Sequence, residues 1–253
     1  MIRLLINADD FGISSEVNEA IKECFSKELI NRTSIMVNMP AYNEAIEIAK
    51  VCNFKDKVGL HINIMEGNPL TEDIKHTLFC TNGVFNGEVF KKTVNRFWLN
   101  KNTRKALEKE IRAQIEKYLE DGFCLKHIDS HEHSHTNYSV MNVLNPLLHE
   151  YEFKSVRLSR NIPHKKIRGM KRVYKKFFNW KIIKFNSKSG NETSRIKAFG
   201  GLEDIQQLIY NEEHYKIIEL MVHPIMISGK IEDGIKRIGI ENWLSTQKYN
   251  IKW

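Results

Sequence analysis

Short apolar runs alternate along the chain with segments of about 10 to 18 residues that repeat apolar side chains at helical spacing. The runs, typical of buried strands, are residues 3–8, 33–38, 58–64, 124–129, 155–159 and 216–224. The helical segments are residues 14–25, about 40–49, 104–120 and 138–149. Strands that alternate with helices pair in parallel, with the helices outside. We therefore predict an α/β fold, a distorted (β/α) barrel of about seven parallel strands that resembles a TIM barrel.

The 253 residues contain no linker rich in Gly, Ser or Pro, so we predict a single catalytic domain over residues 1–253. Two stretches depart from the alternating pattern. Residues 65–100 lack clean periodicity, which predicts a long excursion over one face, a lid. Residues 160–198 form a basic insertion.

Composition restricts the class of protein. With 42% apolar residues the chain can bury a large core, and no run approaches the ~18 apolar residues of a membrane span. The first residues turn acidic too early for a secretory signal, so we expect a cytoplasmic location. The cysteines are scattered, which argues against a zinc knuckle or a disulfide scaffold and predicts reduced thiols at Cys24, Cys52, Cys80 and Cys124.

The positive net charge belongs to one segment. Residues 154–197 contain fifteen Lys or Arg and a single acid, Glu192, whereas the rest of the chain is net acidic. Lysines here interleave with the apolar residues of an amphipathic helix, whose apolar side would cover the barrel or touch an interface: Val173, Phe177, Trp180 and Ile183. We expect no nucleic-acid binding and leave open a peripheral membrane contact through this segment.

Polar residues gather at the ends of the predicted strands, which meet at one mouth in parallel α/β folds. Asp9 and Asp10 directly follow the first apolar run. An Asp pair often only begins a turn and caps the next helix. Adjacent carboxylates can also divide labour, one binding a cation and the other accepting a proton from the attacking water.

Histidines occur at two further strand ends. His61 interrupts an apolar strand, where a lone His is more often a hydrogen-bonded core residue than a ligand. The decamer KHIDSHEHSH, residues 126–135, holds four of the ten histidines. If the strand continued through it, alternate residues would share one face: His127, Asp129, His131, His133 and His135. Asp129 would then orient an imidazole, and the remaining histidines would bind substrate or support the loop.

Two later residues complete the candidate set. His223 ends the last clear strand and is either structural or a general acid that protonates a leaving amine. Arg157 is either a salt-bridged barrel residue or the partner that fixes a catalytic carboxylate, and the sequence leaves both readings open.

Five motifs in order, NADDFG, VGLHINI, HIDSHEHSH, VRLSR and ELMVHP, resemble the YdjC-like carbohydrate deacetylases over nearly the whole chain. The resemblance implies a distorted α/β barrel with one divalent metal, Mg or Zn, and an N-acetylated sugar as substrate. It also implies that Asp10, His61 and His131 bind the metal, that Asp9 is the base and that His223 is the acid. The family usually reads DSHHHVH, whereas Glu132 replaces the middle His here.

Two other functions remain open at this level. A metal-dependent phosphoester hydrolase also uses Asp and His at strand ends, but it commonly employs two metals and more carboxylates. A non-catalytic carbohydrate-binding relative is compatible with Glu132 but not favoured by an intact Asp9, Asp10, His61 and His131. The sequence leaves the sugar, the metal and the oligomeric state undetermined.

Overall fold

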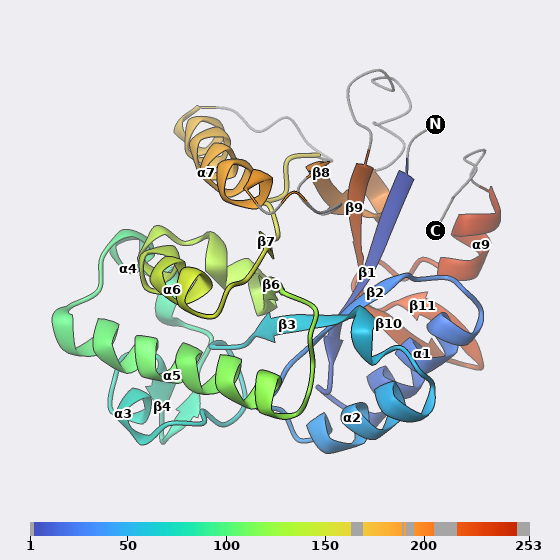
Figure 1. Cartoon of the computed structure of the whole chain (residues 1–253), viewed down its shortest axis with the longest axis horizontal. Helices are drawn as coiled ribbons and strands as arrows, with labels where there is room; N and C mark the ends of the chain where they lie inside the picture. Colours follow the sequence, from blue (N-terminus) through green and yellow to red (C-terminus); the bar gives the residue numbers. More distant parts are fainter. Residues whose placement is uncertain (1–2, 163–168, 189, 191–194, 205–216, 247–253) are drawn as a thin grey trace.

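A strongly curled sheet of seven parallel strands forms the centre of the computed structural model, which describes residues 3–162, 169–188, 190, 195–204 and 217–246 (Figure 1). The strand order is β7-β6-β3-β2-β1-β9-β8, and every neighbouring pair is parallel. The strands are β1 (Arg3–Phe11), β2 (Arg32–Ile35), β3 (Val58–Ile62), β6 (His127–Ser130), β7 (Ser155–Val156), β8 (Ile196–Gly201) and β9 (Ile217–Val222). The predicted α/β fold with a distorted barrel of about seven strands is confirmed.

Helices cover the outside of the sheet. They are α1 (Ser15–Ser26), α2 (Tyr42–Val51), α5 (Lys101–Glu120), α6 (Tyr138–Glu150), α7 (Met170–Ser187) and the shorter α9 (Ile240–Thr246). Ser14 caps α1 by accepting a hydrogen bond from the Val17 N–H, and Asn100 caps α5 through the Thr103 N–H. Helices α1, α2, α5 and α6 bury their apolar stripes in the core, as the 3.6-residue spacing predicts.

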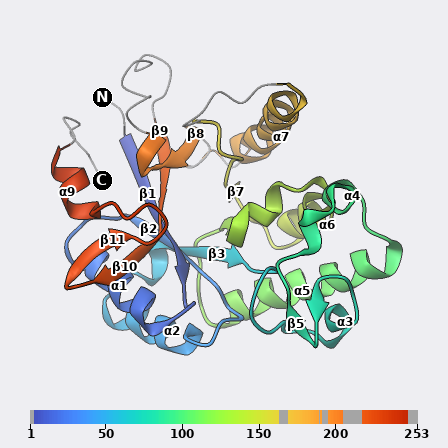
Figure 2. The same cartoon turned by 180° about the vertical axis from the view of Figure 1, so that it is seen from behind.

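Residues 65–100 are folded and lie beside α5 in both views (Figures 1 and 2). Their elements are α3 (Glu72–Lys75), β4 (Cys80–Thr81), β5 (Val84–Phe85), the 3₁₀ turn η2 (Val89–Lys91) and α4 (Thr93–Phe97). Glu110 of α5 is buried and accepts hydrogen bonds from the backbone N–H groups of Leu70 and Thr71. The segment is thereby fastened to α5, and its role as a lid stays a prediction.

After β9 the chain forms a hairpin of β10 (Pro224–Ile227) and β11 (Lys230–Asp233), which the sequence did not predict. Three further 3₁₀ turns complete the described elements: η1 (Lys55–Lys57), η3 (His131–Thr136) and η5 (Leu202–Asp204).

Asparagine side chains cover the two edge strands. Asn186 of α7 accepts from the Val156 N–H and donates to the Val156 carbonyl, both at 2.9 Å, so it replaces a missing strand beside β7. Asn179 does the same for Ser159 at 2.8 Å. Across the gap in the barrel, Asn161 exchanges hydrogen bonds with Phe199 of β8. The unpaired backbone groups of an edge strand are a template for aggregation. These asparagine side chains form hydrogen bonds with such groups.

Helix α7 lies within the predicted basic insertion, of which residues 163–168, 189 and 191–194 are outside the described residues. The sequence left open whether the apolar side of this helix covers the barrel or touches an interface, and packing on the barrel holds for Ile183 but not for the other three residues. Phe178 and Ile182 are buried, whereas Val173, Phe177 and Trp180 are exposed. The reason is that the hydrogen bonds of Asn179 and Asn186 to the edge of the sheet set the rotation of the helix, not its aromatic stripe.

Candidate active site

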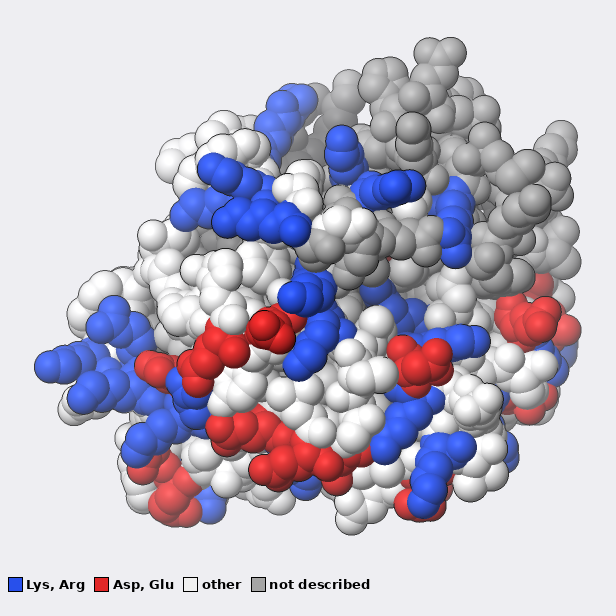
Figure 3. Space-filling view, viewed as in Figure 1, with Lys and Arg blue, Asp and Glu red and all other residues white. Residues whose placement is uncertain are grey.

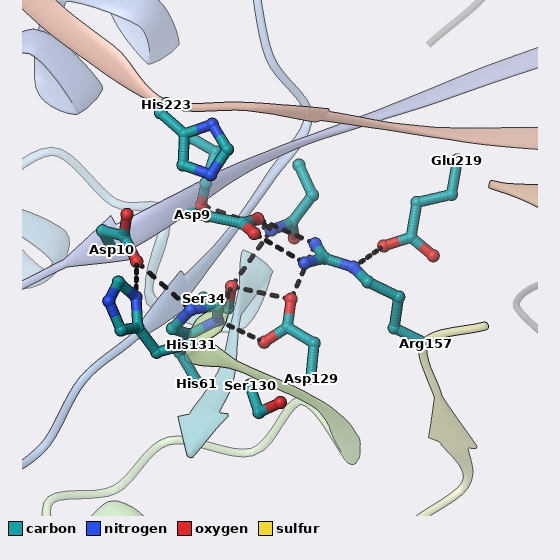
Figure 4. Close-up of polar contacts among 12 residues, drawn as sticks. Asp9, Asp10, Ser34, His61, Asp129, Ser130, His131, Arg157, Glu219 and His223 are labelled. Carbon is teal, nitrogen blue, oxygen red and sulfur yellow. Dashed lines mark hydrogen bonds and ion pairs between the residues drawn. The ribbon is translucent and has the colours of Figure 1, made fainter. Parts of the chain in front are cut away.

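Asp9 and Asp10 both line a cleft at the carboxyl end of the sheet, with a volume of about 280 Å³. Neighbouring residues of a regular strand point to opposite faces. Here the pairing of β1 with β2 shifts between Ala8 and Phe11, and Asp10 has a positive φ of 67°. A bulge of this kind turns one residue of a strand towards a new direction. It brings both carboxylates to the same cleft. Figure 4 shows Asp10 directed at His131 and Asp9 directed at Arg157.

His61 and His131 converge on Asp10. The Nε2 of His61 lies 3.2 Å from Asp10 Oδ1, and the Nδ1 of His131 lies 2.8 Å from the same oxygen (Figure 4). His61 comes from β3, whereas His131 follows β6 at the start of η3. Three strand ends that are far apart in the sequence therefore meet at one point, where His131 and Asp10 keep partial exposure to the cleft.

The spacing of these three groups fits a divalent cation. A metal about 2.1 Å from each of two ligands holds them ~3.0 Å apart at a right angle and ~3.4 Å apart at a tetrahedral angle. The separations of 2.8 and 3.2 Å lie close to that range. A carboxylate with two imidazoles suits zinc or another transition ion, and waters in the open positions would also admit magnesium.

Two other His and carboxylate clusters lie within the described residues, Asp9 with His61 and Asp129, and His127 with Asp129 and Glu219. A guanidinium already forms ion pairs with the carboxylates of both clusters. Arg157 is fully buried and contacts Asp9 at 2.6 Å, Asp129 at 2.6 Å and Glu219 at 2.7 Å. Burial alone disfavours a charged guanidinium, but the three carboxylates outweigh it and raise the pKa of Arg157 well above its usual value. The candidate cation site is therefore the cluster that faces the cleft, Asp10 with His61 and His131.

His61 is oriented from behind by a carboxylate. Its Nδ1–H donates to Asp129 Oδ1 at 2.7 Å, and Ser34 donates to the other oxygen of Asp129. This leaves Nε2 directed at Asp10, the arrangement in which a carboxylate fixes the tautomer of a metal-binding histidine. Despite burial, the contacts with His61 and Arg157 lower the pKa of Asp129, so it stays ionised.

His223 stands across the cleft, directly after β9. Its Nδ1 lies 3.6 Å from Asp233 Oδ2, and its backbone N–H donates to the same carboxylate at 2.8 Å. Burial favours the neutral imidazole, yet Asp233, together with Asp9 and Asp10, outweighs it and raises the pKa of His223. The side chain is thus predisposed to carry a proton near neutral pH.

The expectation that alternate residues of the histidine decamer share one face of a strand was wrong. Strand β6 ends at Ser130, and Glu132 and His133 then adopt positive φ angles of 51° and 53°. The chain coils because Ser130 Oγ accepts the backbone N–H of His135, which breaks the alternation of an extended strand.

Each remaining histidine of the decamer therefore has its own environment. His127 binds Ser155 inside the barrel, and His135 donates to the Arg157 carbonyl. His133 lines the cleft with its ring edge-on to Phe199. Burial lowers the pKa of all three, to about 4 for His135, so they are neutral.

The comparisons with known proteins agree with this architecture. The chain matches the profile of the family described as YdjC-like protein over residues 3–243. The chain belongs to this YdjC-like family. A protein of Clostridium beijerinckii named carbohydrate deacetylase is 32% identical over 235 residues, which cover 91% of this chain and 84% of the relative. One of Vibrio vulnificus with the same name is 28% identical and covers 91% and 81%.

A solved structure from Enterococcus faecalis V583, named for cellobiose-phosphate cleavage, covers 90% of this YdjC-like chain and 82% of its own. It superposes with a TM-score of 0.63 at 22% identity, so it supports the fold.

The YdjC-like motifs did not reveal several residues of the site. Glu66 contacts His131 Nε2 at 2.8 Å, and Glu219 and Asp233 hold Arg157 and His223. Glu219 carried a usable signal, because it is a lone acid inside an apolar strand, the same signal that drew attention to His61. Asp233 lies in the unpredicted hairpin, and Glu66 lies in the segment without periodicity, so neither had one.

Proposed function

We propose that this YdjC-like chain is a metal-dependent carbohydrate deacetylase that hydrolyses the N-acetyl group of a sugar or oligosaccharide and releases acetate. The observation that carries the proposal is the convergence of Asp10, His61 and His131 at one cleft, with Asp9 and His223 at its sides. Relatives with the name carbohydrate deacetylase, which match about 90% of the chain, support the same activity.

Asp10, His61 and His131 would hold one divalent cation, Mg or Zn. Such a cation acidifies water and polarises the amide carbonyl. Asp129 keeps the Nε2 of His61 directed at the site, and Glu66 contacts the outer nitrogen of His131.

Asp9 would act as the base. Both of its oxygens accept from Arg157, at 2.6 and 2.8 Å, and Oδ1 also accepts from Asn7 at 2.8 Å. These bonds fix the orientation of the carboxylate at the cleft and leave it lone pairs for a proton. Asp9 would take a proton from water as the water oxygen bonds to the acetyl carbon.

His223 would act as the acid. Burial opposes the charged form, but Asp233, Asp9 and Asp10 raise the pKa of His223 and so favour the protonated imidazole. As the C–N bond of the amide breaks, His223 would give its proton to the departing nitrogen, which leaves as the sugar amine. One proton is taken and one is given, so the reaction converts amide and water into acid and amine.

The substrate proposed is a chito-oligosaccharide or a surface-polysaccharide precursor. The rim of the cleft is polar and carries both signs of charge, with Glu132, Arg160, Glu203 and Lys236. Such a rim offers donors and acceptors to sugar hydroxyls. A phosphoester hydrolase with two metals fits less well, because Arg157 already forms ion pairs with the carboxylates of the other two clusters found among the described residues.

Acetate release by the purified protein tests the proposal. The substrates are N-acetylglucosamine and its β-linked oligomers, assayed with Mg or Zn and with a chelator, and an aryl phosphodiester serves as the comparison. We expect acetate from at least one sugar, lost with chelator and restored by metal. Phosphodiester cleavage without acetate release from any of these sugars would refute the assignment.

A further inference from the structure

The outer face of α7 presents a stripe of large apolar side chains. Met170, Val173, Phe177 and Trp180 recur three or four residues apart and are 89%, 68%, 49% and 56% exposed. The opposite face of the helix is already used, since Phe178 and Ile182 are buried. The stripe therefore contributes nothing to the barrel core, and apolar exposure of this extent on one helix marks an interaction site.

The stripe continues onto α4. The ring of Phe97 packs edge-on against Tyr174 of α7, with 5.7 Å between the centroids. Phe97 and its neighbours Val94 and Trp98 are themselves half or more exposed. We call these seven residues the apolar patch: Val94, Phe97, Trp98, Met170, Val173, Phe177 and Trp180.

Positive charge surrounds this apolar patch. Helix α7 carries six Lys or Arg and no acid, and residues 89–107, which include α4, also carry six and no acid. Figure 3 shows Lys and Arg gathered over α7 and over the beginning of α5. Lys181 and Lys184 lie 4.9 and 5.4 Å from the rings of Phe177 and Trp180, so cations and aromatic rings occupy the same outer face.

We propose that the apolar patch docks this protein onto an anionic phospholipid bilayer. Aromatic and aliphatic side chains enter the boundary between headgroups and acyl chains, while the surrounding lysines bind lipid phosphates. None of the described helices is long and apolar enough to cross a membrane, so α7 lies on the surface. Single-stranded nucleic acid would need faces on which bases stack. The four aromatic residues of the apolar patch could stack bases, but Met170, Val173 and Val94 add aliphatic surface that only a lipid would bury, and this favours lipid.

The docking helix is joined to the loops that line the cleft. The Tyr174 hydroxyl donates to the Thr136 carbonyl in η3, the turn that begins with His131. Lys175 donates to the carbonyl of Arg160, which lines the cleft. Docking through α7 therefore holds the cleft beside the bilayer.

Co-sedimentation of the full chain with vesicles tests the proposal. Vesicles of phosphatidylcholine alone are compared with vesicles that also contain phosphatidylglycerol, at rising salt. We expect binding to the anionic vesicles that weakens as salt screens the lysines. Trp180→Ala with Lys184→Glu should lower the partition coefficient at least about tenfold, because it removes both contributions. The matched control, Val51→Ala with Lys50→Glu on α2, changes the same two properties at exposed positions and should bind normally.

Several outcomes would overturn the proposal. They are no binding, equal binding to neutral vesicles, or equal losses in the two double variants. Tighter binding of polyuridine RNA than of anionic vesicles at 150 mM salt would make the face a nucleic-acid site. Sedimentation velocity showing a dimer that only the α7 variant dissociates would make it an interface between copies. Because all four substituted residues are exposed, unchanged circular dichroism confirms folding, and quenching of tryptophan by brominated lipid gives an independent readout.

Discussion

The candidate cation site competes directly with protons. Burial disfavours imidazolium, but Asp129 and Asp10 outweigh it and raise the pKa of His61 to about 10, while Asp10 and Glu66 raise that of His131 to about 9. Cation binding needs neutral imidazoles. Near pH 7 we expect binding to release protons, and affinity to rise with pH until both pKa values are passed. Calorimetry in buffers of different ionisation enthalpy measures the release, and a buffer-independent heat would contradict it.

Asp9 and Asp10 should separate catalysis from cation binding although they are adjacent. Asp9 contacts Arg157, not His131, so Asp9→Asn should retain the cation and lose about 10²- to 10⁴-fold in kcat for acetate release. Asp10→Asn should lose the cation itself. Metal analysis of the two purified variants beside their rates distinguishes them. Full activity of Asp9→Asn, or loss of metal from this variant, would refute the assignment of catalysis to Asp9 and of cation binding to Asp10.

Asp233 is the residue that tunes His223. Burial alone would favour neutral His223, and the Asp233 carboxylate contributes to raising its pKa. The acid form is present below this raised pKa and is lost as pH rises through it. Asp233→Asn should therefore move the alkaline limb of the pH–rate profile to lower pH, with the limiting rate less affected. The backbone N–H groups of His223 and Lys236 bind different oxygens of Asp233, so the single amide oxygen of Asn keeps an acceptor for only one of them. An unshifted limb would contradict the assignment.

At the scale of the element, α7 should stabilise the barrel through two amides. Asn179 and Asn186 are buried and satisfy both backbone groups of Ser159 and Val156. Replacing either with Ala leaves a buried donor and acceptor unpaired, which costs about 1 to 3 kcal/mol of unfolding free energy. Urea unfolding measures the loss. Asn145→Ala on α6, an exposed position, is the control and should change it by less than ~0.5 kcal/mol.

An element can be predicted from the sequence when apolar burial stabilises it, and less well when single side-chain hydrogen bonds determine its position. Six strands of the central sheet and helices α1, α5 and α6 follow from apolar spacing, which dominates where burial is extensive, whereas β8 (Ile196–Gly201) was not predicted. The amphipathic pattern of α7 left open which side faces the barrel, because spacing alone does not show that Asn179 and Asn186 bind a strand edge. The coil after Ser130 arises from a side-chain bond to His135 across five residues, which no periodicity records.

Some features of the candidate site could likewise be predicted from the sequence and others could not. The meeting of Asp10, His61 and His131 could be expected because parallel strand ends share one edge of the sheet. The bulge at Asp10 could not be predicted, since it depends on the register between β1 and β2. At the scale of the whole molecule, the curl of the sheet is what turns adjacent strand ends into a cleft (Figure 1).

Arg157 ties the whole barrel together, because it joins carboxylates from β1, β6 and β9. Arg157→Met would leave buried Asp9 without its ion-pair partner, while Asp129 would keep only His61 and Glu219 only Arg32. Removing one partner of a buried ionic cluster costs about 3 to 5 kcal/mol. Arg112→Met is the control, because Arg112 binds Glu108 and Glu150, which are 50% and 49% exposed, so that screening makes the loss smaller.

The stability loss of Arg157→Met should also depend on pH in a definite direction. The native pKa of Asp129 is held low chiefly by Arg157 against burial, so its contribution to stability is present above the unfolded pKa and is lost as pH falls. Without the guanidinium, burial raises the pKa, and protonation in mild acid relieves the variant. The gap in unfolding free energy between variant and parent should therefore narrow from pH 7.5 to pH 5. Urea unfolding at both pH values measures it, and a constant gap would mean that Arg157 acts by packing rather than by charge.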